Sequence, residues 1–396
     1  MEIKVSVRLK KVPPYLFEEI DRKKKEALAK GVDIIDLGIG DPDQPTPEYV
    51  VTAMQSAVSD AANHNYPSSS GELEYRTAGV EWYLRRFQVS LDPQTEITGL
   101  IGSKEGLSHL SLAYIDPGDI ALVPSPSYPV YRMWTLMAGG EPYSLPLTAE
   151  NKFLPDLKSI PAPVLAKSKL LYLNYPNNPT AAIAPVEFLE SAVAFAKAHG
   201  LLIVYDNAYC DMTYDGYQAP SILQITGAKD VAVEFTSLSK GYNMTGWRIG
   251  FAAGNATAIS ALRVIKSNAD SGQFKAIQKA AIVALTSDAS IQQQNAMYIR
   301  RRDILCNGLN ALGWNLKPIQ GTFYFWIPVP TGTTSAQFAA TLLETCGLVT
   351  VPGSGYGESG EGYIRMAITV PEARLAEAVE RMREKKIRYG LTPGAV

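Results

Sequence analysis

Cysteine and histidine are both scarce in this chain of 396 residues, which contains three of each. The cysteines, Cys210, Cys306 and Cys346, lie far apart and form neither a disulfide framework nor a zinc-binding pattern. The three histidines also lack the spacing that brings two imidazoles to one metal ion. The sequence therefore argues against a metal-dependent hydrolase, and we expect no bound metal.

An excess of charge of either sign is also missing. Lysine and arginine total 37, aspartate and glutamate total 39, and the formal net charge is −2. Nucleic acids and anionic membranes attract strongly basic surfaces. The densest basic run, residues 22–25, is followed by Glu26 in a segment typical of a solvated helix. We therefore expect the chain to bind neither nucleic acid nor a membrane.

Long apolar runs are absent as well. No segment stays apolar for the roughly 20 residues that a membrane-spanning helix needs, and residues 1–5 do not resemble a signal peptide. These absences predict a cytoplasmic protein. The length of 396 residues is enough for two or three domains.

Short strand-like runs alternate with helical stretches in the middle of the chain, which is typical of a mainly parallel sheet covered by helices. Between the first two runs, a helix is predicted to begin at Pro185 and to end at Gly200, which makes a βαβ crossover. The predicted strands cover residues 168–174, 201–206, 231–236 and 247–253.

Polar residues end three of these strands, namely Asn174, Asp206 and Thr236. In open α/β sheets the ligand crevice lies just beyond the carboxyl ends of the strands. The sequence therefore predicts a site at this edge of the sheet.

The chain changes character from about residue 292 onward. A basic helix around residues 300–302, strands at 322–327 and 363–368, and a final helix from Pro371 are predicted there. Three apolar residues of the final helix recur at spacings of four and three, so one face should be buried. They are Leu375, Val379 and Met382. This part is interpreted as a smaller α+β domain.

The most specific feature of the sequence is the segment TSLSKGYNMTGWRIG, residues 236–250. Lys240 directly follows an apolar strand, where partial burial would lower its pKa and make its amine a nucleophile toward an aldehyde. Ser237 and Arg248 supply a hydroxyl and a guanidinium that can converge on a phosphate.

A second candidate for phosphate binding is the segment GSKEG, residues 102–106, which opens a predicted helix. Leu107, Leu110 and Tyr114 share one face of that helix. The free N–H groups and the positive end of a helix attract a phosphate, and Ser103 is a favourable N-cap residue.

The lysine motif resembles that of the fold-type I, class I aminotransferases, which depend on pyridoxal 5′-phosphate (PLP), and the resemblance extends over nearly the whole chain. It implies an α/β fold with a mainly parallel seven-stranded sheet in a large domain, beside a smaller α+β domain. We predict an N-terminal arm and part of the small domain at residues 1–40, the large PLP-binding domain at 41–290, and the C-terminal small domain at 291–396. The resemblance also implies amino acid and 2-oxo acid substrates, and a homodimer with shared active sites.

The resemblance assigns roles to residues around the cofactor ring. Lys240 would carry the cofactor, Asp206 would keep its pyridine nitrogen protonated, and Tyr209 would donate a hydrogen bond to its phenolic oxygen. These three are the implied catalytic residues. Tyr128 would stack on the ring, and Asn178 would bind the phenolic oxygen.

Further implied cofactor contacts are Ser103, Lys104, Ser237 and Arg248, and Tyr66 would reach the phosphate bound in the neighbouring subunit. The segment NYPNNPT, residues 174–180, resembles the family's Asn-Pro-Thr-Gly signature, with Ala181 in place of the glycine. That departure falls on a turn and leaves Asn178 in place.

On the substrate side, the resemblance implies that Arg365 grips the α-carboxylate, with Asn178 nearby and Gly40 allowing the backbone to approach. Within the family, the chain looks most like the LL-diaminopimelate aminotransferases of lysine biosynthesis, in which Tyr15 and Lys104 would contact the substrate. Plant-type members have a glutamate for the distal ammonium in the tyrosine loop, where this chain reads YPSSSG at residues 66–71.

Several alternatives stay open or are disfavoured at this point. An aspartate, alanine or aromatic aminotransferase, or a PLP-dependent carbon–sulfur lyase, would have the same cofactor residues. A nicotinamide-dependent dehydrogenase is disfavoured because the loop from Gly38 to Asp43 lacks the third glycine of the dinucleotide fingerprint. A PLP-binding transcription regulator is disfavoured because only a few dozen residues precede the predicted cofactor domain.

Overall fold

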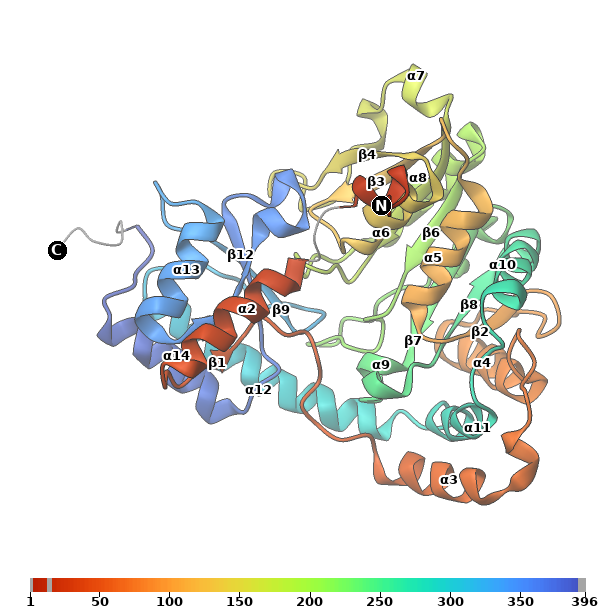
Figure 1. Ribbon diagram of the computed structural model, residues 1–396, viewed down its shortest axis with the longest axis horizontal. Helices are drawn as coiled ribbons and strands as arrows, with labels where there is room; N and C mark the ends of the chain where they lie inside the picture. Colours follow the sequence, from red (N-terminus) through yellow and green to blue (C-terminus); the bar gives the residue numbers. More distant parts are fainter. Residues whose placement is uncertain (1–2, 13–15, 391–396) are drawn as a thin grey trace.

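A computed structural model describes residues 3–12 and 16–390, and its largest element is a seven-stranded sheet with the order β2-β8-β7-β6-β5-β3-β4 (Figure 1). The strands β3 to β7 pair in parallel, whereas β8 is antiparallel to both of its neighbours. The strands are β2 (Ile97–Leu100), β3 (Ile120–Ser125), β4 (Glu141–Pro146), β5 (Ser168–Asn174), β6 (Leu202–Asp206), β7 (Ala232–Ser237) and β8 (Gly250–Gly254). The predicted seven-stranded, mainly parallel sheet is confirmed.

Successive residues of each strand face opposite sides of the sheet and enter two different cores. Leu171 and Leu173 of β5 pack in one core, and Leu170 and Tyr172 pack in the other. The first core is covered by α4 (Leu73–Phe87), α8 (Val186–His199) and α11 (Lys275–Ala284). The second core is covered by α5 (Ser103–Tyr114), α6 (Val130–Ala138) and α10 (Ala256–Ala269). Burial on both faces explains why these strands are almost uniformly apolar.

The predicted crossover helix is confirmed as α8, which connects β5 to β6. Leu189, Ala192, Val193 and Ala196 form its buried face. Gly200 ends the helix with φ 65°, a left-handed conformation that glycine adopts without steric cost.

One predicted strand begins too early. We expected a strand over residues 247–253, but Thr245–Trp247 form the 3-10 helix η5, and β8 begins only at Gly250. The reason is Arg248, whose φ of 55° lies in the left-handed region and is incompatible with a strand. The chain therefore turns at Arg248 before it enters the sheet.

A second group of elements surrounds a three-stranded antiparallel sheet with the order β11-β12-β9 (Figure 1). Its strands are β9 (Tyr324–Pro328), β11 (Val351–Pro352) and β12 (Tyr363–Ala367), and β1 (Ile35–Asp36) pairs in parallel with β10 (Leu348–Val349) nearby. The helices α12 (Ala289–Ala311), α13 (Ser335–Cys346) and α14 (Glu372–Glu384) bury their apolar faces in its core.

The predicted final helix is confirmed as α14, with Leu375, Val379 and Met382 buried. The predicted strands at 322–327 and 363–368 correspond to β9 and β12. The remaining helices are α1 (Val7–Lys10), α2 (Leu16–Ala29), α3 (Glu48–Ser59), α7 (Ala162–Leu165) and α9 (Leu238–Gly241). The remaining 3-10 helices are η1 (Ala61–His64), η2 (Leu157–Ser159), η3 (Ile222–Gln224), η4 (Ala228–Asp230), η6 (Gly353–Tyr356) and η7 (Glu358–Gly360). The domain boundaries after residues 40 and 290 stay predictions.

Within residues 3–12 and 16–390, no helix has both the length and the apolar character required to cross a membrane.

Candidate active site

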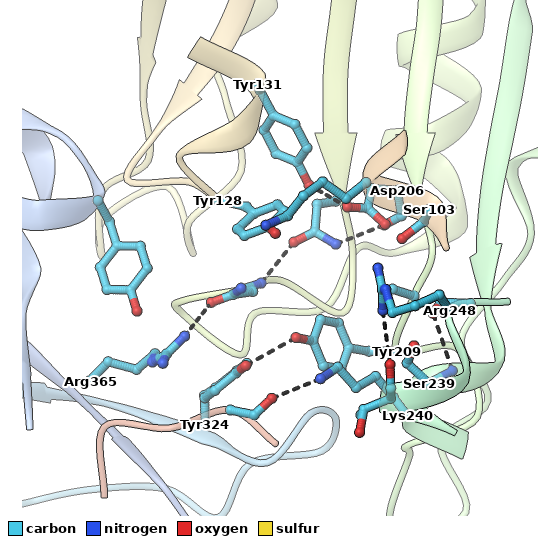
Figure 2. A pocket seen from close by; sticks show the side chains of 18 residues that line it. Ser103, Tyr128, Tyr131, Asp206, Tyr209, Ser239, Lys240, Arg248, Tyr324 and Arg365 are labelled. Atoms are coloured by element: carbon cyan, nitrogen blue, oxygen red, sulfur yellow. Dashed lines mark hydrogen bonds between the residues drawn. The ribbon is translucent and has the colours of Figure 1, made fainter. Parts of the chain in front are cut away.

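A cavity of about 560 Å³ lies at the carboxyl ends of β5, β6 and β7, where the sequence predicted a site (Figure 2). Asn174 and Asp206 line it as expected. Thr236 does not line it. Its hydroxyl lies 3.1 Å from the hydroxyl of Tyr83, which belongs to the first of the two cores. The alternation of side chains along β7 explains this difference, because it brings Ser237 to the cavity and turns Thr236 away.

Of the predicted site residues that the structure describes, all but Tyr66 line this cavity. Those that do are Gly40, Ser103, Lys104, Tyr128, Asn178, Asp206, Tyr209, Ser237, Lys240, Arg248 and Arg365. Tyr15 lies outside the described residues. Tyr66 is not among the lining residues, and 86 % of its surface is exposed.

Lys240 is presented by α9, a single helical turn that follows β7 directly. The Ser237 side chain caps this turn by accepting a hydrogen bond of 3.2 Å from the Ser239 backbone N–H. The Lys240 amine donates a hydrogen bond of 2.7 Å to the Gly40 carbonyl and lies over the Phe323 ring. Burial of this amine lowers its pKa to about 8, as the sequence led us to expect.

Asp206 ends β6 and is buried. Its Oδ2 accepts a hydrogen bond of 2.7 Å from the Tyr131 hydroxyl, and burial raises the pKa of the carboxyl to about 6. Oδ1 is equally buried and accepts no hydrogen bond of ordinary geometry from any residue within 3–12 and 16–390. A buried carboxylate oxygen without a donor is costly, so Asp206 is suited to a ligand that brings a donor or a positive charge.

Two segments form the phosphate side of the predicted site. Helix α5 begins at Ser103, with Gly102 at the N-cap position, so the N-cap role expected for Ser103 is wrong. Gly102 takes that position because its φ of 74° suits glycine and because a Cβ there would lie 2.5 Å from a guanidinium nitrogen of Arg248. The Arg248 side chain therefore packs directly against the start of α5.

Lys104 lies in the first turn of α5, with its amine 5.8 Å from the centre of the Tyr128 ring. Burial, together with the positive charge of Arg248, lowers the pKa of Lys104 from its usual value.

Arg365 of β12 lies on the opposite side of the cavity from Ser103 and Asp206 (Figure 2). It is 2 % exposed and donates hydrogen bonds of 3.0 Å to Asn178 Oδ1 and 2.6 Å to the Gly38 carbonyl. Its guanidinium also lies 4.0 Å from the centre of the Tyr324 ring.

The turn that carries Asn178 contains the one departure from the family signature. Ala181 has a φ of 59°, so it occupies the left-handed position that favours glycine. The turn nevertheless keeps its hydrogen bonds, including one of 2.8 Å from the Asn178 N–H to Asn174 Oδ1. The departure therefore falls on a turn, as expected.

Sequence reasoning missed three tyrosines that line the cavity. Tyr131 binds Asp206 and lies three residues after Tyr128, a helical spacing that could have identified it. Tyr324 and Tyr356 come from distant segments that carry no recognisable motif. The Tyr324 hydroxyl lies 3.1 Å from that of Tyr209, and it would lie 1.9 Å from a Cβ added to Gly40.

The charges of the lining suit an anionic ligand. Among the described residues that line the cavity, Lys104, Lys240, Arg248 and Arg365 are basic, and Asp206 is the only acidic one. Guanidinium groups bind phosphate and carboxylate with paired hydrogen bonds. Because Arg248 and Arg365 lie on separate sides, one ligand could be held by a phosphate at one end and a carboxylate at the other.

Comparison with known proteins gives a consistent result. Residues 32–382 match the family "Aminotransferase class I and II". The chain is 56 % identical over 384 residues to LL-diaminopimelate aminotransferase 2 of Trichormus variabilis, a match that covers 96 % of this chain and 98 % of that protein. It is 52 % identical over 390 residues to the LL-diaminopimelate aminotransferase of Gloeobacter violaceus, covering 98 % of this chain and all of the relative. The substrate-bound BacF structure from Bacillus subtilis superposes with a TM-score of 0.95 at 36 % identity, covering 99 % of this chain and 100 % of that one.

Proposed function

This chain belongs to the class I and II aminotransferases, and from that membership we propose that it binds PLP on Lys240 and prefers LL-diaminopimelate as amino donor and 2-oxoglutarate as acceptor. Members of the family are PLP-dependent, and their substrates are amino acids and 2-oxo acids. The chain is therefore an enzyme with transaminase activity.

The buried Oδ1 of Asp206, which has no well-placed donor among the described residues, is the observation that carries the cofactor proposal. A protonated pyridine nitrogen would donate a hydrogen bond and a positive charge to this buried carboxylate. The Tyr131 hydroxyl already holds the other oxygen, so the carboxylate is oriented before a ligand binds. Since burial raises the pKa of Asp206 to about 6, a cationic partner would favour the ionised form.

The opposite end of the cofactor would lie between α5 and the Arg248 turn. The N–H groups at the start of α5 offer donors for a phosphate, and the helix dipole adds a positive potential. Ser103, Ser237 and Arg248 line the cavity here and would add two hydroxyl groups and a guanidinium. Tyr128, also in the lining, supplies an aromatic face for the ring.

Lys240 has the environment that a nucleophile and proton carrier needs. With a pKa lowered to about 8, a substantial share of its amine is neutral near physiological pH. When bound, the cofactor supplies an aldehyde for the amino group and an electron-withdrawing ring that acidifies Cα of the substrate. Lys240 Nζ would take the proton from Cα as a general base. Tyr209 lines the same cavity and would donate to the cofactor's phenolic oxygen, with Asn178 as a second donor.

The α-carboxylate of the substrate would bind Arg365, whose guanidinium is oriented by the Asn178 side chain and the Gly38 carbonyl. The planar fork of N–H donors matches a carboxylate in a way that a lysine cannot. Gly40 lines the cavity without a side chain and would let the backbone approach the substrate.

A homodimer with shared sites is part of the proposal. Tyr66 is 86 % exposed and lies outside the lining of its own cavity, which suits a residue that reaches the phosphate in a second copy. We also propose that residues 1–40 and 291–396 form a unit distinct from the PLP-binding residues 41–290. The pairing of β1 with β10 supports that division.

The preference for LL-diaminopimelate rests on the relatives of that name and on the charges of the site. This donor has an amino acid head at each end. Arg365 would bind the near carboxylate, and Tyr15 and Lys104 would bind the distal head, with Lys104 facing its carboxylate. Leaving one buried polar group unmatched costs about 1 to 3 kcal/mol, so several such contacts would discriminate strongly against short donors.

Steady-state rates with 2-oxoglutarate and each of four donors test the assignment. We expect LL-diaminopimelate to have a higher kcat/KM than aspartate, alanine or phenylalanine. A higher value for any of these three would contradict the donor assignment but leave the aminotransferase assignment intact. Release of ammonia and a thiol from a sulfur-containing donor, independent of any oxo acid, would instead identify a carbon–sulfur lyase.

A further inference from the structure

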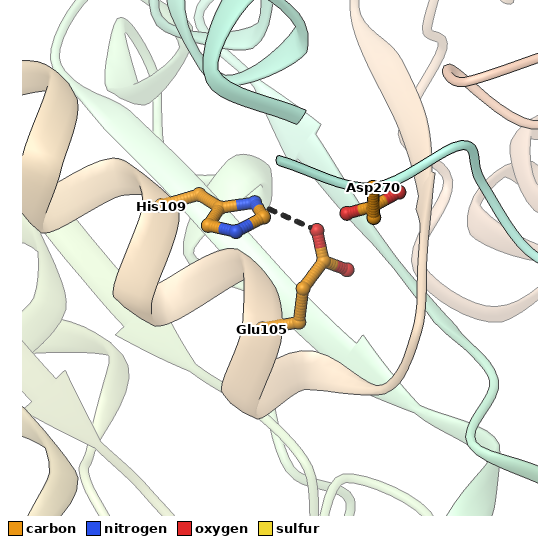
Figure 3. A group of neighbouring side chains, drawn as sticks. All are labelled: Glu105, His109 and Asp270. Atoms are coloured by element: carbon orange, nitrogen blue, oxygen red, sulfur yellow. Dashed lines mark ion pairs between the residues drawn. The ribbon is translucent and has the colours of Figure 1, made fainter. Parts of the chain in front are cut away.

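A partly buried ion cluster lies beside the start of α5, and none of its residues lines the cavity. Figure 3 shows three of its members, Glu105, His109 and Asp270. Lys266 of α10 is 1 % exposed, and its amine lies 3.1 Å from Glu105 Oε1 and 3.0 Å from Asp270 Oδ1. His109 Nδ1 lies 2.8 Å from the same oxygen of Glu105. Removing one partner from such a buried group leaves an uncompensated charge, so the cluster constrains the elements that it joins.

This cluster does not require a metal ion. Glu105, His109 and Asp270 bring their ligand atoms within 4.8 Å of one another, an arrangement that could in principle hold a cation. The Lys266 ammonium, however, already lies against both carboxylates. A metal ion between them would be repelled by this positive charge at close range, whereas the lysine itself compensates the two negative charges.

Two segments form the phosphate side, the start of α5 and the turn that contains Arg248. Each carboxylate of the cluster stabilises one of them. Glu105 lies in the first turn of α5, and its Oε2 accepts a hydrogen bond of 2.7 Å from the Ile101 N–H. This bond fixes the strand-to-helix turn that leads into Ser103.

Asp270 is connected to the other segment. Its Oδ1 accepts a hydrogen bond of 2.8 Å from the Gly272 N–H, which fixes the turn after α10. The next residue, Gln273, donates through its side-chain amide to the carbonyls of Trp247, at 2.7 Å, and Arg248. Through this turn, the cluster is connected to the backbone that holds the Arg248 guanidinium.

We propose that Lys266 is a positioning residue for the cofactor phosphate. It fixes Glu105 and Asp270 relative to each other, so that the N-terminus of α5 and Arg248 direct their donors to one point. Lys266 does not line the cavity, and it acts only through these two carboxylates. The inference rests on the proposed function, because it needs PLP as the cofactor.

The test compares two ligands that differ only in the phosphate. Full-length protein freed of cofactor is titrated with PLP and with pyridoxal, and binding is followed by absorbance. For Lys266→Met, which removes the charge and keeps most of the length of the side chain, we expect the Kd for PLP to rise about tenfold, the size typical of losing a residue that orients a direct ligand contact. The Kd for pyridoxal should change by less than about twofold, because pyridoxal has no phosphate to position.

Two further variants complete the experiment. Asp270→Asn keeps an oxygen for the Gly272 N–H and leaves Lys266 paired with Glu105, so it should show a smaller loss that is again specific to PLP. It also serves as the test should Lys266→Met fail to fold. Lys197→Met is the matched control, because Lys197 forms an ion pair of 2.7 Å with Asp230 at the surface and should leave both constants unchanged.

The outcomes separate this inference from the proposed function. An equal loss for PLP and pyridoxal would mean a general role in stability and would overturn the inference, as would unchanged binding of both ligands. If the unsubstituted protein binds neither ligand, both the proposed function and the inference are wrong. If it binds both ligands but Lys266→Met shows no PLP-specific loss, only the inference fails.

Discussion

The two sides of the cavity are built differently. On the cofactor side, Asp206, Ser237 and Lys240 lie at or directly after the ends of adjacent parallel strands, and buried hydrogen bonds orient Asp206 and the turn that carries Lys240. On the substrate side, Gly40 and Arg365 come from segments far apart in the chain.

Hydrogen bonds from Thr369 and Arg301 hold the loop that contains Gly40 against the rest of the substrate side. Thr369 donates a hydrogen bond of 2.7 Å to the Ile39 carbonyl, and Arg301 of α12 forms two hydrogen bonds of 2.7 and 2.8 Å to the Asp43 carboxylate. A sheet edge fixes chemistry that every member of a family shares, whereas loops can vary and select among donors. Substitutions on the cofactor side should therefore lower kcat with every donor, and those on the substrate side should mainly raise KM.

Replacement of the lysine should have the largest effect. We expect Lys240→Ala to lower kcat by about 10⁴-fold or more with every donor, because it removes both the nucleophile and the proton carrier. Lys197→Ala, which removes an exposed lysine outside the cavity, is the control and should keep full activity. Turnover close to normal in Lys240→Ala would contradict the assignment of the cofactor side.

Asp206→Asn should lower kcat by about 10² to 10³-fold, because the carboxylate stabilises charge that develops during the reaction. Its Kd for PLP should change much less. The matched control is Asp211→Asn, since Asp211 is also buried, with a pKa raised to about 6 by burial, but pairs with Arg86 outside the cavity. Equal kcat in the two variants would show that Asp206 only ends a strand.

On the substrate side, Arg365→Lys should lower kcat/KM by about ten- to a hundredfold, the cost of a charge-assisted hydrogen bond. The loss should appear mainly in KM and should be similar for all donors, because each has an α-carboxylate, while the Kd for PLP stays unchanged. Arg302→Lys is the control, because Arg302 is equally buried and pairs with Asp215 outside the cavity. A weaker affinity for PLP in Arg365→Lys would remove the distinction between the two sides.

The pH dependence of cofactor binding tests the environment of Lys240. The neutral amine is the nucleophile, so the rate at which cofactor-free protein takes up PLP should rise as pH increases to about 8 and then level off. An ordinary lysine would give a rate that keeps rising toward its usual pKa of about 10.4. Stopped-flow absorbance between pH 6 and about 10 distinguishes the two profiles.

A mixing experiment tests whether the cofactor side is shared between copies. Tyr66→Ala and Lys240→Ala should each have low activity, and mixing them should give partial recovery, because one site of a hybrid dimer contains both intact residues. Activity of the mixture is compared with the mean of the separate samples. Sedimentation of the fully active protein as a monomer would contradict shared sites.

The contrast between the two sides also explains what the sequence could predict. Lys240, Ser237 and Arg248 lie within one short segment, and Asp206 ends a strand whose apolar pattern is unmistakable, so local reasoning located the cofactor side. The strand 168–174 was predicted with its observed bounds because both of its faces are buried.

Other features depend on three-dimensional contacts that leave no local pattern. Tyr324 lines the cavity from the start of β9, and Tyr356 lines it from the end of η6. The start of β8 was misplaced because arginine has no preference for the left-handed backbone conformation that Arg248 adopts. Ser103 was assigned as an N-cap because serine is favourable at that position. The close approach of Arg248, however, leaves no room for a side chain at the N-cap, so Gly102 occupies it.

The measurement that tests the account most directly is the position of the cofactor itself. Borohydride fixes a covalent bond between PLP and a lysine, and peptide mass spectrometry then identifies the modified residue. We predict a yellow protein in which the pyridoxyl group is found on Lys240 and is absent from the Lys240→Ala variant. A pyridoxyl group on any other residue would contradict the assignment of this cavity as the active site.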